Sequence, residues 1–245
     1  MDKKRLDILL FEKGLTNSRE KAKALIMSGN VLVNGQKITK PGTRFSGKEE
    51  IIIKERIKYV SRGGLKLEHA LKEFNLNLDG KVAIDIGAST GGFTDCLLQN
   101  SIEKVYAVDV GYGQLDFKLR QDSRVKVIER CNFRYIEKDK INELVDIIVV
   151  DVSFISLKII IPKAIEFLKS NGDIVALIKP QFEVGKNEVG KGGIVKDGEK
   201  HKHVIEELTI FFEKLGLKVK GLTNSPILGQ KGNKEFLIHL KKCDK

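Results

Sequence analysis

The stretch VAIDIGASTGGFTDCLL, residues 82–98, is an apolar run that breaks into a turn of small residues and resumes with a helical pattern. A strand ending at Asp85 and a turn without bulky side chains let the backbone approach a ligand closely at the carboxyl end of the strand. Phe93 stands where a P-loop has its lysine, and the dinucleotide spacing G-x-G-x-x-G is also missing. The stretch therefore predicts a nucleotide site and argues against an NTPase or a dinucleotide enzyme.

The pattern D-[IV]-G-x-x-x-G-G resembles the S-adenosylmethionine (SAM) site of methyltransferases, in which the loop wraps the amino-acid part of SAM. In that family, an acid at the end of the second strand holds the ribose hydroxyls. Asp109 lies at the end of the second expected strand, 24 residues after Asp85, and its carboxylate can accept both hydroxyl protons. Asn132, after the third strand, is either an adenine contact or a turn residue. The expected SAM-binding residues are Asp85, Gly87, Ala88, Ser89, Thr90, Gly91, Gly92, Asp109 and Asn132.

The residues after the fourth expected strand indicate the class of methyl acceptor, because this strand end faces the SAM sulfur in the fold. Amino-group methylases carry [DN]-P-P-[YF] there, whereas this chain has DVSF, residues 151–154. No cysteine stands directly after the fourth or the fifth strand, so covalent attack of a thiol on a pyrimidine ring is not supported. A hydroxyl acceptor remains.

Methylating a ribose hydroxyl requires an in-line approach and help in removing a weakly acidic proton. Lys179 ends the fifth strand and can act as that base only if burial and neighbouring charges favour its neutral form. Asp151 ends a neighbouring strand, so the two side chains can meet. With Lys66 at the start of a helix and Glu235 in the last strand, they resemble the K-D-K-E tetrad of rRNA 2'-O-methyltransferases related to FtsJ. The resemblance implies four catalytic residues, Lys66, Asp151, Lys179 and Glu235.

Strands and helices alternate from residue 80 onward. Two later β-rich runs, 217–223 and 233–242, have only a short connection and are expected to pair antiparallel at one edge. The earlier runs are separated by helix-length segments, which predicts a parallel, doubly wound sheet. The expected fold class is α/β, and this layout resembles a Rossmann-like SAM-dependent methyltransferase domain. The five parallel strands are expected at residues 81–87, 104–111, 125–130, 146–152 and 173–180.

The front of the chain has a different pattern, with two short helices at 5–14 and 16–29, a hairpin around Asn34-Gly35 and a strand at 49–55. Its motif R-L-D…G…S-R-x-x-A-x-x-x-I-x-x-G-x-V-x-V-N-G resembles the S4 domain, a small RNA-binding α+β module. The expected RNA-binding residues are Arg5, Arg19, Lys21 and Lys23. The expected organisation is an N-terminal S4-like domain at 1–57, a linker at 58–64 and the methyltransferase domain at 65–245.

The net charge of +11 is unevenly distributed. Residues 1–58 hold 14 Lys/Arg against 7 Asp/Glu, and the other 187 residues hold 30 against 26. A densely basic front segment is expected if it meets nucleic acid, although a solvated lysine-rich surface has the same composition. The S4 pattern favours RNA.

The complete set of motifs is similar to the TlyA family over nearly the full chain. It includes YVSRGGLKL, DVSFISL and KPQFEVGK…GKGGIV in addition to the tetrad and the S4 pattern. The resemblance implies methylation of cytidine 2'-hydroxyls in 16S or 23S rRNA, with SAM as cofactor and ribosomal RNA or ribosomal subunits as partners. The family is often labelled hemolysin, so a membrane-active cytolysin is one alternative. A non-catalytic RNA-binding assembly factor is the other.

Other sequence features have weaker implications. Three widely spaced cysteines fit neither a disulfide framework nor a zinc site. No run is long and apolar enough to span a membrane. We therefore expect a cytoplasmic protein that has no membrane as a partner. His201 and His203 point to different faces of a helix, and no metal is expected. The glycine-rich segment 185–198 is either a lid over RNA or a solvated loop.

Overall fold

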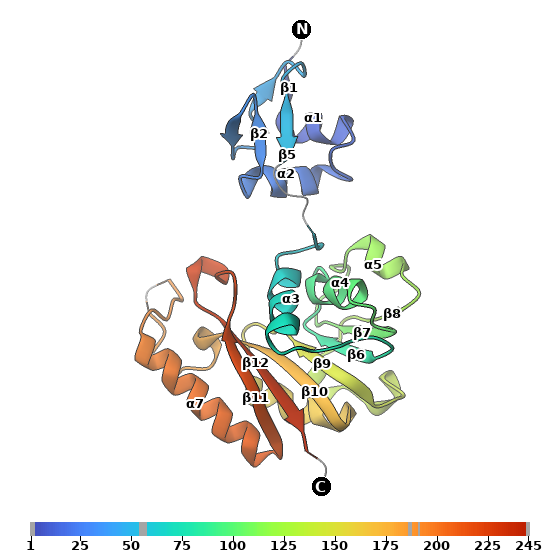
Figure 1. The fold of residues 1–245 in the computed structure, drawn as a ribbon, viewed down its shortest axis with the longest axis vertical. Helices are drawn as coiled ribbons and strands as arrows, with labels where there is room; N and C mark the ends of the chain where they lie inside the picture. Colours follow the sequence, from blue (N-terminus) through green and yellow to red (C-terminus); the bar gives the residue numbers. More distant parts are fainter. Residues whose placement is uncertain (1–2, 54–57, 186–187, 191, 244–245) are drawn as a thin grey trace. The chain divides into compact units, whose positions relative to one another are not determined.

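The computed structural model describes residues 3–53, 58–185, 188–190 and 192–243. The chain divides into two compact units, Met1–Lys58 and Tyr59–Lys245, drawn in Figure 1 with labels on most of their elements. The smaller unit corresponds to the S4-like domain expected from the sequence, and the larger unit to the expected α/β domain. Within the described parts of the chain, no helix is long and apolar enough to cross a membrane.

The S4 domain packs two helices against two small sheets. The helices are α1 (Leu6–Glu12) and α2 (Arg19–Met27). An antiparallel sheet of order β3-β2-β5 contains β2 (Val31–Val33), β3 (Gln36–Ile38) and β5 (Ile51–Ile53), and β1 (Lys4–Arg5) pairs with β4 (Arg44–Phe45). Asn34 and Gly35 connect β2 and β3 with positive φ angles of 49° and 77°, so the hairpin predicted from this dipeptide is confirmed. The strand predicted at 49–55 is shorter, and its last two residues lie outside the described residues.

The second unit is built on a seven-stranded sheet of order β11-β12-β10-β9-β6-β7-β8. Its strands are β6 (Val82–Ile86), β7 (Lys104–Val108), β8 (Val125–Ile128), β9 (Val145–Val150), β10 (Leu168–Ile178), β11 (Leu217–Asn224) and β12 (Phe236–Lys242). The first five are mutually parallel. β12 lies between β10 and β11 and is antiparallel to both. The predicted parallel sheet with an antiparallel pair at one edge is confirmed.

Helices cover both faces of this sheet. The helices are α3 (Gly63–Glu73), α4 (Gly92–Gln99), α5 (Phe117–Gln121), α6 (Leu157–Ala164) and α7 (Gly198–Lys214). Side chains of α3, α4 and α5 pack in one apolar cluster and those of α6 and α7 in another. Successive residues of a strand alternate between the clusters, as Ala83 and Ile84 of β6 do. Because both faces are buried, the central strands β6, β7 and β9 are nearly continuous apolar runs, whereas the edge strand β11 alternates between buried or half-buried and exposed residues.

The second unit begins before the domain start expected at residue 65. Tyr59 is only 2% exposed and packs in the same cluster as α3 and α4. Helix α3 begins at Gly63, and a Cβ atom on Gly64 would lie 2.2 Å from the Tyr59 ring. Residues 59–64, expected to belong to a linker at 58–64, are therefore part of this unit. Residues 54–57 lie outside the described part of the chain.

Candidate active site

The glycine-rich loop between β6 and α4 passes directly beside the end of β9. Gly87 has a φ of +86°, and a Cβ atom there would lie 2.5 Å from the carbonyl oxygen of Asp151. Gly91 has a φ of +96° and precedes α4, where a Cβ atom would meet Leu119 at 2.2 Å. Both positions therefore require glycine for conformation and for space. The result is a closely packed turn that forms a wall of the site, with Ser89 and Thr90 among its lining residues.

Asp109 fixes this loop from the end of β7. Its Oδ2 accepts a hydrogen bond from the Ser89 amide at 2.8 Å, and its Oδ1 accepts one from the Gly111 amide at 2.7 Å. Each carboxylate oxygen has a second lone pair, so both can still accept a hydroxyl proton. Asn132 uses its Oδ1 to cap a 3-10 turn by accepting from the Arg134 amide at 3.2 Å. Asn132 is thus a turn residue in this structure, and it lies on the same cavity as Asp109.

That cavity has a volume of about 430 Å³, within the range of small-molecule sites. Its walls are mostly apolar, with Ile86, Val108, Phe133 and Ile160 among the lining residues. Asp109 and Asn132 supply polar atoms at the wall. An apolar slot with a carboxylate that accepts two hydrogen bonds suits a nucleoside, so the residues present fit the adenosine part of SAM.

Asp85 does not line this cavity but lies inside the domain, one residue before the end of β6. It is fully buried, and its Oδ2 accepts a hydrogen bond from Thr94 Oγ1 at 2.6 Å. Its Oδ1 is buried without a hydrogen-bond partner. Burial raises the pKa of Asp85 to about 7, and the hydrogen bond from Thr94 only partly opposes this. Asp85 is therefore an internal residue that hydrogen-bonds Thr94 of α4, and it does not face the cavity.

This buried carboxyl group gives stability a pH dependence of known sign. A pKa of about 7 in the folded state, against 3.8 ordinarily, means that the folded protein holds the proton more tightly, so stability is lost as pH rises from about 4 to about 7. We expect Asp85→Asn, which resembles the protonated form, to gain Tm relative to the wild type between about pH 5 and pH 8. A Tm difference that stays constant over this range in calorimetry would contradict the assignment.

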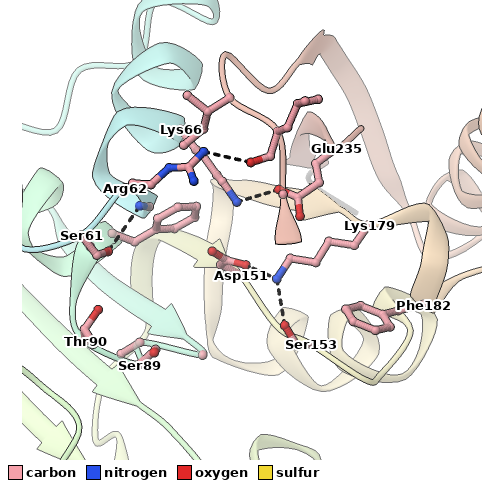
Figure 2. A pocket seen from close by; sticks show the side chains of 18 of the residues that line it. Ser61, Arg62, Lys66, Ser89, Thr90, Asp151, Ser153, Lys179, Phe182 and Glu235 are labelled. Carbon is pink, nitrogen blue, oxygen red and sulfur yellow. Dashed lines mark hydrogen bonds and ion pairs between the residues drawn. The ribbon is translucent and has the colours of Figure 1, made fainter. Parts of the chain in front are cut away.

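The four charged residues of the predicted tetrad come together around a second cavity of about 310 Å³. Lys66 Nζ lies 2.6 Å from Glu235 Oε2, and their side chains are 11% and 3% exposed. Lys179 Nζ lies 2.6 Å from Asp151 Oδ1, an ion pair without hydrogen-bond alignment, and donates a hydrogen bond to Ser153 Oγ at 3.0 Å. Figure 2 shows the two pairs facing the same pocket. The sequence expectation that Asp151 and Lys179 meet is confirmed.

Strand register explains why these residues meet. Asp151 and Lys179 directly follow β9 and β10, which are parallel neighbours, so both side chains are at the same edge of the sheet. Glu235 directly precedes β12, which is antiparallel to β10, and Ile178 pairs with Phe236. Because β10 and β12 run antiparallel, the residue after Ile178 and the residue before Phe236 are neighbours, and these are Lys179 and Glu235. Lys66 reaches the cavity from the first turns of α3.

The two cavities share part of their lining, namely Gly87, Ser89, Asp151 and Ser153. A ligand in the first cavity and a substrate in the second would therefore approach each other beside Asp151. Such an arrangement suits a group transfer between two bound molecules, because it places the reacting atoms in contact.

Several residues at the site were missed by sequence reasoning. Arg62 lines the second cavity and donates a hydrogen bond to the carbonyl oxygen of Leu228 at 3.1 Å. Phe154 is 86% exposed, has a φ of +65°, and its ring centroid is 5.0 Å from that of Phe182. A positive φ is uncommon for a bulky side chain. The motif DVSF contained the signal for this exposed aromatic residue, but a phenylalanine in a sequence normally indicates core.

Two of the four residues expected to bind RNA also have a structural role. Arg5 donates hydrogen bonds to both carboxylate oxygens of Asp7, at 2.9 and 3.0 Å, and Arg19 lies 3.4 Å from the same group. Asp7 is completely buried, and the Arg5 guanidinium lowers its pKa. The two arginine side chains remain 41% and 46% exposed, so they compensate a buried charge and still face solvent. Lys21 and Lys23 are half-buried residues of α2.

The glycine-rich segment 185–198 is partly outside the described residues, at 186, 187 and 191. Asn233 holds its described end by accepting a hydrogen bond from the Val195 amide at 3.1 Å and donating one to the Gly193 carbonyl at 3.0 Å. The ring of His201 is 2.8 Å from the Val195 carbonyl oxygen. His201 therefore has a packing role. Among the described residues there is no cluster of three or more His, Cys, Asp or Glu that could hold a metal ion.

Comparisons with known proteins agree with this architecture. Residues 59–242 match the FtsJ-like methyltransferase family, and residues 4–51 match the S4 domain. Hemolysin A of Brachyspira hyodysenteriae is 45% identical over 96% of this chain and 98% of its own. The 16S/23S rRNA (cytidine-2'-O)-methyltransferase TlyA of Mycobacterium tuberculosis is 41% identical over 97% of this chain and 89% of its own. A solved structure named as a hemolysin of Streptococcus thermophilus is 49% identical, with a TM-score of 0.78 over all of this chain and 90% of that one.

Proposed function

We propose that this chain, which belongs to the TlyA family of proteins with an S4 domain and an FtsJ-like methyltransferase domain, methylates a ribose 2'-hydroxyl of ribosomal RNA. The observation that carries the proposal is the shared wall of the two cavities, where Asp151 lines both the mostly apolar slot and the second pocket and pairs with Lys179, which lines the second pocket. SAM would occupy the slot and supply an electrophilic methyl group. The M. tuberculosis relative is named a cytidine-2'-O-methyltransferase, so cytidine is the nucleotide that we propose.

The residues that line the two cavities have separate roles in this proposal. Asp109 orients the ribose of the cofactor, and the backbone of the loop at Gly87 limits how far the ligand can move toward β9. Lys179 donates a hydrogen bond to the target 2'-oxygen through the N–H group that contacts neither Asp151 nor Ser153. Lys66 and Glu235 pair with each other, so they form one wall of the pocket without adding net charge beside Lys179.

The decisive measurement is mass spectrometry of 16S and 23S rRNA after incubation with the purified protein and SAM. We expect one 2'-O-methylated cytidine or more that is absent when either component is omitted. Unmodified rRNA, both as naked RNA and as ribosomal subunits, would contradict the proposal. An enzyme that modifies ribosomal RNA works where ribosomes are, so we also propose a cytoplasmic location.

Removing residues 1–56 tests the role of the S4 domain. Its excess of basic residues neutralises RNA phosphates, and each neutralised phosphate makes log affinity fall with log salt by about 0.7 to 0.9. We expect the truncated protein to bind rRNA more weakly and with a flatter salt dependence, while its SAM affinity in calorimetry is unchanged. Equal rRNA binding by the truncated and full-length proteins would rule out this role.

A further inference from the structure

Glu183 joins the two loops that carry Asp151 and Lys179. It follows the short 3-10 helix η4 (Pro180–Phe182) after β10, but its carboxylate reaches the loop after β9. Its Oε2 accepts a hydrogen bond from Ser156 Oγ at 2.6 Å, and its Oε1 accepts one from the Leu157 amide at 2.9 Å. One side chain thus fixes both the last residue of the DVSFIS loop and the first residue of α6.

The path from Glu183 back to Lys179 is short and hydrogen-bonded. The Phe182 amide donates to the Lys179 carbonyl at 2.8 Å, and the Glu183 amide donates to the Pro180 carbonyl at 3.0 Å. A displacement of the Glu183 carboxylate is therefore transmitted to Lys179 through one turn of backbone.

The loop after β9 is also fixed at both ends by hydrogen bonds. Asp151 is fixed at the end of β9 by its amide, which donates to the Ile86 carbonyl at 3.0 Å. Ser156 caps α6 by accepting from the Lys158 amide at 3.1 Å. Between these points the loop carries Ser153 and the exposed Phe154, and its far end is fixed by Glu183.

Burial of the Glu183 carboxylate costs free energy, and a purely structural role does not require that cost. Burial raises the pKa of Glu183, and the hydrogen bonds from Ser156 and Leu157 only partly oppose the effect. A serine at the N-cap already satisfies one amide of α6. A helix start alone does not require a buried acid from a different loop, whereas two loops that must keep a fixed separation do.

We propose that Glu183 is a positioning residue for methyl transfer, which sets the distance between the loop with Asp151 and Ser153 and the loop with Lys179. The inference rests on the proposed function, and it adds a residue that touches neither cavity. It predicts a larger effect on turnover than on SAM affinity, because Glu183 sets the separation of Asp151 and Lys179. The nucleoside slot shares residues 151–155 with the loop that Glu183 fixes, but Asp109, which would hold the SAM ribose, is fixed by the Ser89 and Gly111 amides and not by Glu183.

The test compares three substitutions in the full-length protein. Glu183→Ala removes both hydrogen bonds, Glu183→Asp keeps the charge but is one methylene too short, and Glu183→Gln keeps the length with one acceptor and one donor. A positioning role predicts that kcat falls about tenfold or more in the Ala and Asp variants, that Gln restores most of it, and that the SAM affinity changes less than about twofold. Glu207→Ala is the matched control, since Glu207 pairs with Lys158 of α6 from the surface.

Three results would overturn the inference. One is turnover of Glu183→Ala close to that of the wild type. Another is better rescue by Asp than by Gln, which would show that charge rather than length matters. The third is an equal loss in the Glu207→Ala control, which would show general sensitivity of α6. Failure of the proposed function is distinguishable, because the wild-type protein itself would then leave rRNA unmodified.

Discussion

Lys179→Ala is expected to lower methyl transfer by about 100- to 1,000-fold while the protein still binds SAM and rRNA. The Lys179 ammonium is held by Asp151 at 2.6 Å and by Ser153 at 3.0 Å, and it lines the second cavity. Under the proposed function it would face the substrate oxygen as negative charge develops, and removing such a group has a loss in kcat of that size. Single-turnover methylation with saturating SAM and rRNA measures the loss. Normal affinities with normal turnover would remove Lys179 from the mechanism.

Lys179→Arg separates two roles of the same side chain. A guanidinium stays protonated and cannot accept a proton, so a general base predicts that the arginine variant fails as completely as the alanine variant. We expect the arginine variant to lose turnover, because a base role is added to the holding role that the contacts with Asp151 and Ser153 support. Near-normal turnover of the arginine variant would leave Lys179 with the holding role alone, and water or another group would be the base.

Asp109→Ala has the second large expected effect, on SAM affinity. The carboxylate can accept the two ribose hydroxyls while it accepts hydrogen bonds from the Ser89 and Gly111 amides. A hydrogen bond to a charged group contributes about 1.5 to 3 kcal/mol, so we expect Kd for SAM to rise by about 10- to 100-fold. Calorimetric titration measures this directly. Asp139→Ala is the control, because Asp139 is an exposed carboxylate that lines neither cavity, and an unchanged Kd for Asp109→Ala would refute the assignment.

The order of elements and the meeting of Asp151 with Lys179 could be predicted from the sequence, because parallel strands end at the same edge of a sheet. The place of Glu235 beside them could not be derived in this way. It depends on the insertion of β12 between β10 and β11 and on the pairing of Ile178 with Phe236, and strand order and register are long-range properties. Glu235 could be assigned to the site only through the resemblance to the K-D-K-E tetrad of the FtsJ-related enzymes.

Side-chain roles were less predictable than positions. A sequence does not show which charges are buried, so Asp7 gave no sign that it engages Arg5 and Arg19. Asp85 was expected at the ligand surface, whereas it is fully buried behind the loop. These differences have one physical cause, because burial and partner choice are decided by residues that are distant in the chain.

The insertion of β12 also has a consequence for how the protein is made. This strand follows both β10 and β11 in the chain, yet it lies between them and pairs with both along its length. Until β12 is synthesised and inserted, β10 and β11 each have an exposed edge, and the pocket lacks Glu235. Chains fold from the N-terminus during synthesis, and non-local pairing comes late. The pocket is therefore completed only at a late step of folding, when β12 enters between two strands that precede it.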